Sequence, residues 1–550
     1  MSIRTLILTM VFFAFACTGC RKAEQDVFPI LPSLHVSMSS KQLDSILENQ
    51  DNKVFASALI FDTSGDTLYQ GDLTHIKTRG NTTFKEPKKS FAIKFPKKQC
   101  LFGLKKSKSF ILLANACDES HIRNAIGSDL AQVCGIPAVS YAYLTLFIND
   151  SYMGLYQITN KVDIGKDALD ITDLEQLNKE ANPKALKEYE WYGRGRKKRA
   201  VQRKGVLLDR NPDDITGGYL LDNTGPVTQY IKSISGFVSD ANDNIRIRSP
   251  KDASPQEVDY IAERYNEMES AILATDGINP KTGKHYSEYI NVESFARYYL
   301  LNELLMNWDG GWNSFMMYKD IDAIDSKIHA GPAWDYDRTL DNPIFLENNN
   351  LFMYNEFYVN RERKNYSGGL LYHLCQHKDF QQEVKKCYLN EISPALHRYL
   401  AAPSFDSLVD LLSHEANRDN MKYRTRHSKD YKTATSRATD FLRKRIDFFD
   451  WYFSSGEDER VLAHYITKEG KDRYFYFPLG KAVVVPQLET QYNRSPVYEL
   501  FYAGTDSLVT EGTVFQSRQN LEIRKREATK YEIQKRRIRK KLEKIGIIKG

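Results

Sequence analysis

The densest group of side chains able to do chemistry lies in residues 302–342. A predicted helix ends just before Asp309, which opens a Gly-Gly turn, and Asn313 then leads into a short strand. A second turn and strand follow, and Asp335 and Asp337 come at the end of that second strand. Because antiparallel strands joined by a turn lie side by side, the hairpin should bring Asp309, Asn313 and Asp335 together at one end.

This set of side chains suits a particular metal chemistry. Two carboxylates and an amide make a hard oxygen site, which fits Mg²⁺ with phosphate ligands and not zinc. In kinase-type phosphoryl transfer, one Asp orients the hydroxyl nucleophile, while an Asn a few residues later and an Asp on the next turn hold the metal. The order Asp309, Asn313, Asp335 matches that arrangement. The same pattern also fits two Asp/Asn-rich turns that cap helices, and the spacing alone leaves both interpretations open.

A second polar segment lies much earlier in the chain. Arg79-Gly80-Asn81 joins two predicted strands, and Lys88 and Lys89 follow it. A turn of small residues with adjacent cations can cover or pair with phosphates. An ordinary hairpin with solvated lysines is the alternative.

The elements that position these residues are a mixture of strands and helices, which indicates the α+β class. A helix is also expected to begin at Asp118-Glu119-Ser120, and a charged helix over residues 522–545. The remaining clear expectations are strands over residues 54–61, 67–69, 73–78, 88–95 and 139–148, helices over 255–273 and most of 369–453, and strand texture over 460–515.

Composition limits the class of protein. With 550 residues, 41% hydrophobic and 27% charged, the chain can bury a large core and is not wholly disordered. The net charge of +6 comes from the end of the chain, since residues 518–550 hold thirteen Lys and Arg against four Glu. The basic, aromatic segment 191–205 is expected to be an exposed insertion, and no nucleic-acid partner is predicted.

The first twenty residues predict export and lipid attachment. The apolar run over residues 6–17 is too short to span a bilayer and is typical of a signal peptide. Thr18-Gly19-Cys20 resembles a bacterial lipobox, which implies cleavage before Cys20 and a lipid on its sulfur that holds the protein to a membrane. We therefore expect a cell-envelope protein, lipid-anchored at the periplasmic face or cell surface. An ordinary secretory signal with an incidental cysteine is the alternative.

Six segments together resemble the CotH (spore-coat protein H) kinase family, in their order and spacing, over about residues 30–345. They are RGNTTFKEPKKSFAIKF from Arg79, LLANACDESHIRN from Leu112, LFINDSYMGLYQITNKVD from Leu146, GGYLLD from Gly217, NELLMNWDGGWNSFMMYKD from Asn302 and GPAWDYDRTLDN from Gly331. The resemblance implies an atypical protein-kinase-like fold with insertions. It also implies transfer of the ATP γ-phosphate to Ser or Thr of a protein acceptor, with ATP and Mg²⁺ or Mn²⁺ as cofactors.

The resemblance also implies roles for single residues around the hairpin. Asp309 matches the catalytic-loop aspartate, Asn313 the metal-binding asparagine after it, and Asp335 the second metal-binding residue.

Further positions match the part of the family that holds the nucleotide. Lys89 matches the lysine that binds nucleotide phosphates, with Lys94 as the alternative. Arg79 and the Gly80-Asn81 turn would lie near the nucleotide.

Three departures from the family pattern keep other functions open. Asn160 and Asp222 stand where Glu is usual, and the loop from Asp309 to Asn313 is short. The runner-up hypothesis is a catalytically degenerate, kinase-like surface lipoprotein that binds protein or glycan. A third hypothesis is a metal-dependent phosphoesterase that uses Asp309, Asp335 and Asp337.

These expectations divide the chain into five parts. We predict a lipoprotein signal peptide over 1–20, a tether over 21–33, a kinase-like domain with a helical C-terminal part over 34–455, a small β-rich domain over 456–516 and a basic helical tail over 517–550.

Overall fold

The computed structural model of the chain describes residues 31–80, 82–166, 169–183, 187–188, 203–226, 234–307, 309–311, 313–342, 354–360, 369–423, 430–467, 470–483, 497–510, 512–535 and 538. The described residues combine sheets and helices, as expected for the α+β class. Among them, no helix is both long enough and apolar enough to cross a bilayer.

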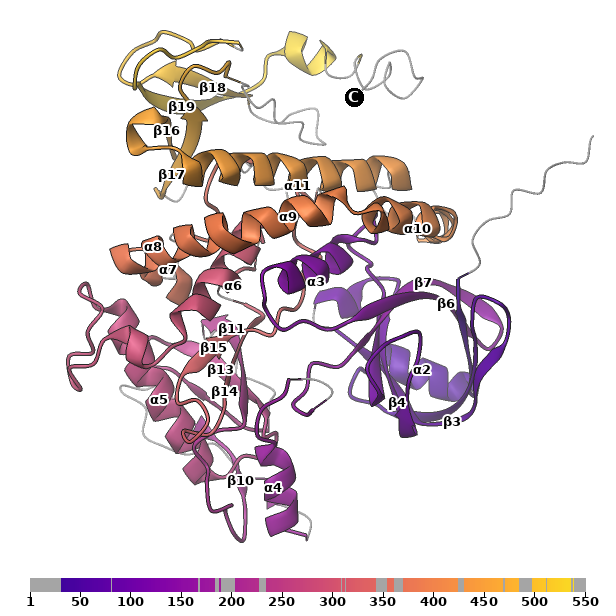
Figure 1. Cartoon of the computed structure of the whole chain (residues 1–550). Coiled ribbons are helices and arrows are strands. Elements are labelled where there is room, and N and C mark those ends of the chain that lie inside the picture. Colours follow the sequence, from indigo (N-terminus) through magenta and orange to yellow (C-terminus); the bar gives the residue numbers. More distant parts are fainter. Residues whose placement is uncertain are drawn as a thin grey trace, which may run out of the picture.

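The N-terminal part is a closed barrel (Figure 1) with the strand order β1-β2-β3-β4-β5-β7-β6. Its strands are β1 (Ser33–Ser37), β2 (Val54–Phe61), β3 (Thr67–Arg79), β4 (Ser90–Gln99), β5 (Ser107–Leu113), β6 (Tyr141–Ile148) and β7 (Ser151–Asn160). Alternate residues such as Phe91, Ile93 and Phe95 fill the barrel, as the period of two requires. Helix α2 (Ser40–Glu48) packs against β2 and β3.

Strand β3 is longer than the sequence predicts. Residues 67–69 and 73–78 were expected to be two strands around a Gln70-Gly71-Asp72 turn, and the structure has one strand of 13 residues. Gly71 stays close to the extended region with φ +157°, and it pairs with Ala58 of β2. Pairing along the whole length of β2 therefore overrides the local turn signal.

The second sheet has the order β15-β14-β11-β13-β12-β9. Its strands are β9 (Arg203–Lys204), β11 (Tyr219–Pro226), β12 (Gly236–Val238), β13 (Asp243–Ser249), β14 (Phe315–Lys319) and β15 (Ile328–Ala330). One face packs on α5 (Pro255–Leu273) and α6 (Val292–Leu304) through Tyr219 and Leu221. The opposite face carries Leu220 and Met316, which pack with Trp334 in a small separate cluster. Short elements nearby are α3 (Arg123–Val133), α4 (Leu174–Ala181), β8 (Lys187–Glu188) and β10 (Val206–Leu207).

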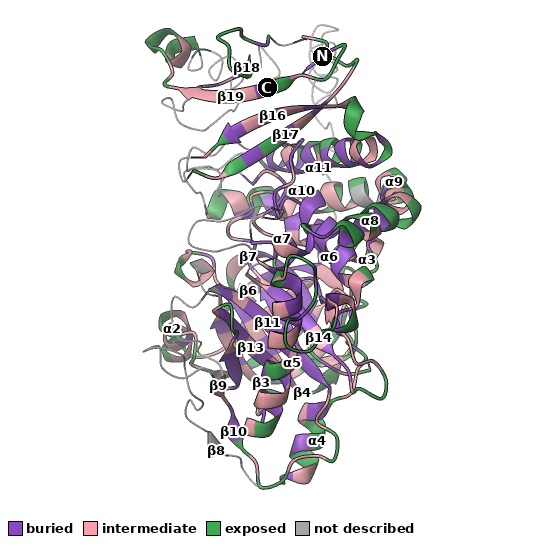
Figure 2. Cartoon of the chain, turned by 90° about the vertical axis from the view of Figure 1, so that its left-hand side faces the viewer, coloured by how far each residue is buried: buried purple, intermediate pink, exposed green. Residues whose placement is uncertain are grey.

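A helical layer lies across both sheets (Figure 1). It contains α7 (Leu370–Leu374), α8 (Lys378–Cys387), α9 (Ser393–Ala401), α10 (Pro403–Lys422) and α11 (Tyr431–Ser454). Its apolar side chains belong to the same core as the helical face of the second sheet, and Figure 2 shows buried residues running through both. Helix α10 docks on the barrel, where the Tyr152 hydroxyl donates to Glu415 at 3.0 Å and the Tyr423 hydroxyl donates to the Met153 carbonyl.

A four-stranded sheet with its own apolar core follows α11, in the order β17-β16-β19-β18. Its strands are β16 (Arg460–Ile466), β17 (Asp472–Pro478), β18 (Val497–Tyr502) and β19 (Asn520–Arg526). The prediction of a helix from Glu522 was therefore wrong at its start, because residues 520–526 pair with β16 and β18. Helical residues begin only at Lys530. The domain bounds predicted from the sequence stay a prediction.

Candidate active site

The loop after α6 holds Asp309 and Asn313 close together. The Asp309 amide donates to Oδ1 of Asn307 at 3.1 Å, which fixes where the loop begins. The Asn313 amide then donates to the Asp309 carbonyl at 3.1 Å, so the backbone of Asn313 returns to that of Asp309. Asp309 is buried and Asn313 is half-buried. The short loop thus keeps Asn313 directly beside Asp309.

Asp335 joins this loop from the end of β15. Its backbone is left-handed, with φ +73°, and its side chain is exposed. The Ser314 hydroxyl donates to Oδ2 of Asp335 at 3.0 Å. Because Ser314 follows Asn313 directly, this bond ties the two ends of the predicted hairpin together.

The charges of the acidic residues converge on Asp337. Burial raises the pKa of Asp337 well above its usual range, and the negative charges of Asp335 and Asp309 raise it further. Arg338 opposes them and lies 3.4 Å from the Asp309 carboxylate. A cation bound near these carboxylates would relieve the repulsion between their charges. The structure therefore places Asp309, Asn313 and Asp335 in one site, which we call the acidic hairpin.

The donor set of the acidic hairpin fits Mg²⁺ or Mn²⁺. Within the described ranges, no group of three or more His, Cys, Asp or Glu side chains is arranged as a ready-made metal site. Two carboxylates and one amide can nevertheless hold a hard cation that takes its remaining ligands from phosphate and water. Such a partial protein ligand set is usual for Mg²⁺ in phosphoryl-transfer sites.

Arg79 reaches the acidic hairpin from the barrel. Its guanidinium carbon lies 5.4 Å from the centre of the Trp334 ring, next to Asp335 in the chain. Burial lowers the pKa of Arg79 to about 10; the charge of Asp335 works against this shift, and that of Arg248 adds to it. The following Gly80 has φ +123°, and a Cβ there would lie 3.2 Å from the Phe84 amide nitrogen, so the turn needs glycine. Asn81 lies outside the described residues.

The two predicted nucleotide lysines lie on β4 and just before it. The Lys89 ammonium donates to the Phe84 carbonyl and lies 4.8 Å from the centre of the Phe84 ring. Lys94 pairs with His75 across β3 and β4, and its neighbours Ile93 and Phe95 fill the barrel, so Lys94 lies on the outer face. Binding of nucleotide by either lysine stays a prediction.

Sequence reasoning missed two arginines of β13. Asp222 on β11 is buried, and its Oδ2 lies 3.0 Å from Arg248 and 3.8 Å from Arg246. The charges of Asp222 and Asp335 both raise the pKa of Tyr298, after burial as the first cause, so both carboxylates lie near that ring. The missed signal is the alternation Arg-Ile-Arg, which puts Arg246 and Arg248 on one face of a strand.

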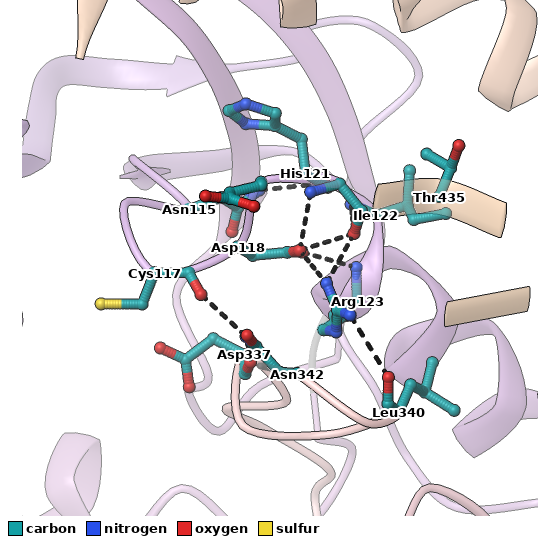
Figure 3. Close-up of polar contacts among 12 residues, drawn as sticks. Asn115, Cys117, Asp118, His121, Ile122, Arg123, Asp337, Leu340, Asn342 and Thr435 are labelled. Atoms are coloured by element: carbon teal, nitrogen blue, oxygen red, sulfur yellow. Dashed lines mark hydrogen bonds and ion pairs between the residues drawn. The ribbon is translucent and has the colours of Figure 1, made fainter. Parts of the chain in front are cut away.

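A buried ion pair holds the segment that carries the acidic hairpin (Figure 3). Asp118 faces Arg123, which also donates to the carbonyls of Thr339 at 2.9 Å and Leu340 at 3.2 Å. Burial alone would raise the pKa of Asp118, but Arg123 and the Ser120 hydroxyl lower it. Residues 118–120 are therefore a turn that binds Arg123, and α3 begins only at Arg123, later than the sequence predicts.

A second contact fixes the same segment to the turn before α3 (Figure 3). The Asn342 amide donates to the carbonyls of Cys117 and Asp337, both at 2.7 Å. The Tyr336 backbone amide in turn donates to Asn124 of α3 at 2.7 Å. Asp335 and Asp337 thus stand on a segment that α3 and its leading turn hold on both sides.

Comparison with known proteins agrees with this geometry. No curated protein matches the chain. A family model described as CotH kinase protein matches residues 76–449, which is more than half of the chain and includes the Arg79 turn, the acidic hairpin and the helical layer. The resemblance predicted from the six segments is confirmed, and the chain belongs to the CotH kinase family.

Proposed function

We propose that this chain is a lipid-anchored, extracytoplasmic protein kinase of the CotH type, which transfers the γ-phosphate of ATP to Ser or Thr of a protein acceptor. Membership of the family supports a kinase-like protein, and a kinase-like family in turn suggests ATP, a divalent metal and a protein substrate. The observation that carries the proposal is the convergence of Asp309, Asn313 and Asp335 with Arg79 opposite them.

Each residue of the site has a chemical task in this proposal. Asp309 accepts the hydrogen bond of the acceptor hydroxyl and takes up its proton as the oxygen attacks the γ-phosphorus. Asn313 and Asp335 would hold Mg²⁺ or Mn²⁺, which would neutralise charge on the phosphates. Arg79 pairs with phosphate oxygens from the barrel side, because a guanidinium can give two parallel hydrogen bonds to them. The bond from the γ-phosphorus to the bridging oxygen breaks, and ADP leaves.

Labelled ATP tests the transfer step directly. The full chain is incubated with γ-labelled ATP and Mn²⁺, and label on the protein is measured. Asp309→Asn should reduce labelling at least about a hundredfold while ATP still binds, because the residue acts on the hydroxyl and not on the nucleotide. Asp335→Ala should abolish metal-dependent ATP binding. Asp213→Asn, in an exposed surface pair, is the matched control and should behave as wild type. Unchanged labelling in Asp309→Asn would contradict the proposal.

A degenerate binding protein is the second candidate, and Asn160 favours it. Its amide donates to the Lys105 carbonyl at 2.9 Å and its side chain is buried, so the residue at the usual Glu position has a structural hydrogen bond. Stabilisation by glycan or protein, with no stabilisation by ATP and Mn²⁺, would select this candidate. Release of phosphate from a model ester without transfer would select the phosphoesterase instead.

The lipid anchor is proposed on sequence alone, since Cys20 lies outside the described residues. Cys20→Ser should leave the precursor without lipid and release the protein from the membrane fraction. Normal membrane retention of this variant would remove the lipoprotein proposal and its placement in the cell envelope.

A further inference from the structure

One outer face of the barrel carries a row of cationic side chains that ends at Arg79. In the β3–β4 register His75 lies opposite Lys94, and Arg79 lies opposite Ser90. Between residues 31 and 113, which hold strands β1 to β5, there are thirteen Lys and Arg against seven Asp and Glu, so this part of the barrel is basic. We call this row the basic band; its members are Lys53, His75, Lys77, Arg79 and Lys94.

Strand alternation turns the side chains of the basic band outward. Ile76 and Thr78 of β3 are fully buried, and Ile76 and Ile93 belong to the barrel core. Residues one position away from them on each strand must therefore point to the outer face. Lys53 is exposed, and the other members are half-buried on the surface of the barrel.

The cations of the basic band act on one another. Burial lowers the pKa of Lys77, and the positive charges of Lys53, Arg79 and Lys251 lower it further, while Asp51 works against them. Lys251 follows β13 of the second sheet, so the positive field continues from the barrel onto the other sheet. Like charges gathered on a surface repel one another and destabilise the free protein, and an anionic partner removes this cost.

His75 lies in the middle of the row and is affected by the same positive charges. Burial lowers its pKa, and the charges of Lys53, Lys94 and Lys77 lower it further. An exposed aromatic residue lies across from this part of β3: Phe55 of β2 is 57% exposed, and the residues on either side of it pair with Ile76 and Leu73. The surface therefore offers one aromatic side chain near the cations, and aromatic residues are enriched in protein interfaces.

The basic band is longer than a triphosphate needs. From Arg79 to His75 the strand rises about 13 Å, at about 3.3 Å per residue. Phosphates that reach a metal at Asp335 can use Arg79 and, from the other sheet, Arg248. The cations farther along β3 are left for another anionic group, one that extends along the barrel.

We propose that the basic band binds a carboxylate-rich segment of the acceptor protein and leads its Ser or Thr to the acidic hairpin. This inference rests on the proposed kinase function and names the substrate class, namely acceptors whose phosphorylated residue is flanked by Asp and Glu. Its direction follows from Arg79, which ends the basic band and lies over Trp334, next to Asp335. A protein segment fits better than a nucleotide chain because the family acts as kinases and Phe55 offers an apolar contact.

Peptide binding to the full chain tests the proposal without requiring catalysis. A fluorescent peptide with Ser among Glu and Asp residues is titrated at low salt, together with a peptide of equal length in which Lys replaces the acids. The acidic peptide should bind and the basic peptide should not, and binding should weaken as salt rises, since surface charges are screened. Lys53→Glu/Lys77→Glu should weaken binding of the acidic peptide about tenfold or more, with the affinity for ATP and Mn²⁺ unchanged.

Matched variants separate the effect of the charges on peptide binding from an effect on folding. Lys105→Glu/Lys106→Glu changes two exposed lysines beyond the far end of β4 and should bind the acidic peptide as wild type does. Lys53→Gln/Lys77→Gln removes the charges without reversing them, and it replaces the charge-reversed variant if that one fails to fold. Equal affinity of wild type and variants for the acidic peptide would overturn the proposal, as would tighter binding of an oligonucleotide of equal length. If the wild-type protein binds the acidic peptide but does not bind ATP, only the proposed kinase function is refuted.

Discussion

The buried ion pair between Lys88 and Asp419 gives the sharpest test of how the barrel is joined to the rest of the molecule. The Lys88 ammonium lies 2.8 Å from Oδ1 of Asp419, and both side chains are at most 3% exposed. The same Oδ1 accepts the Leu155 amide at 2.8 Å. Lys88 precedes β4 and Asp419 lies on α10, so the pair connects the loop after Arg79 to the helical layer.

Removing the carboxylate should be costly because it leaves the cation buried alone. Burial already lowers the pKa of Lys88, and Asp419 is the first group that opposes this shift. Breaking a buried pair by removing one partner costs about 3–5 kcal/mol. We expect Asp419→Asn to lower the free energy of unfolding by that amount. The double variant Lys88→Met/Asp419→Asn should cost about 2–3 kcal/mol less than the sum of the single changes.

Urea denaturation followed by circular dichroism gives the four free energies of this cycle. The matched control is the exposed pair Lys161 and Asp163, whose side chains are about half exposed. The double-mutant cycle of this exposed pair should yield a coupling energy below about 1 kcal/mol, as for other surface pairs. The buried pair does not hold the barrel to α10 if Asp419→Asn costs no more than the same change at Asp163. The same conclusion follows if the costs of Lys88→Met and Asp419→Asn are additive.

Three further results should follow from buried groups elsewhere, each measured as a change in the urea midpoint. Gly154→Ala should destabilise the fold by about 3 kcal/mol or more, because its Cβ would stand 2.0 Å from Oδ1 of Asp419 at φ +113°; a wild-type midpoint would contradict this. Burial raises the pKa of Glu257 from 4.5 to about 7, so its stabilising protonated form is present below about pH 4.5 and lost as the pH rises through 7. The free energy of unfolding should therefore decline as the pH rises, and Glu257→Gln should remove up to about 3 kcal/mol of that decline. If the variant shows the same dependence of stability on pH as wild type, Glu257 is not the group responsible. Arg445→Lys should cost about 3 kcal/mol, since one ammonium cannot replace a guanidinium that binds three carbonyls beside Glu303; a loss below about 1 kcal/mol would argue against it.

Local signals explain which elements could be predicted from the sequence. Helix α5 was predicted at its observed bounds from its apolar spacing, and in the structure Ser254, Pro255 and Glu257 fix its start through a cap and a capping box. The acidic hairpin was also predicted from a local signal, because its three residues lie on one turn–strand–turn–strand unit. The strand β19 was missed because its charged sequence is typical of a helix, and only pairing with β16 and β18 makes it a strand.

Contacts between distant segments explain what the sequence could not predict. Lys88 and Lys89 are adjacent and chemically alike, and the resemblance favoured Lys89 as the binding residue. The structure buries Lys88 against Asp419, which lies in a helix far along the chain with no local sign of its partner. Asp222 was noticed only as a departure from Glu, and its pairing with Arg248 depends on the order of strands in the second sheet. Such pairings follow from topology, which single-sequence patterns do not contain.

Apolar packing and polar contacts together hold the barrel against the rest of the molecule. The side chains inside the barrel form a core of their own, whereas outward-facing side chains such as Tyr143 join the large core of the helices and second sheet. Arg79 lies over Trp334, and Lys88 binds Asp419, so cations at the two ends of the β3–β4 loop each join the barrel to another part. The negative charge of Asp335 acts on Arg79, and this attraction weakens as the distance between the two charges grows. If the proposed function holds, a ligand that pairs with both Arg79 and a metal at Asp335 would therefore favour the arrangement in which the barrel and the acidic hairpin lie close together.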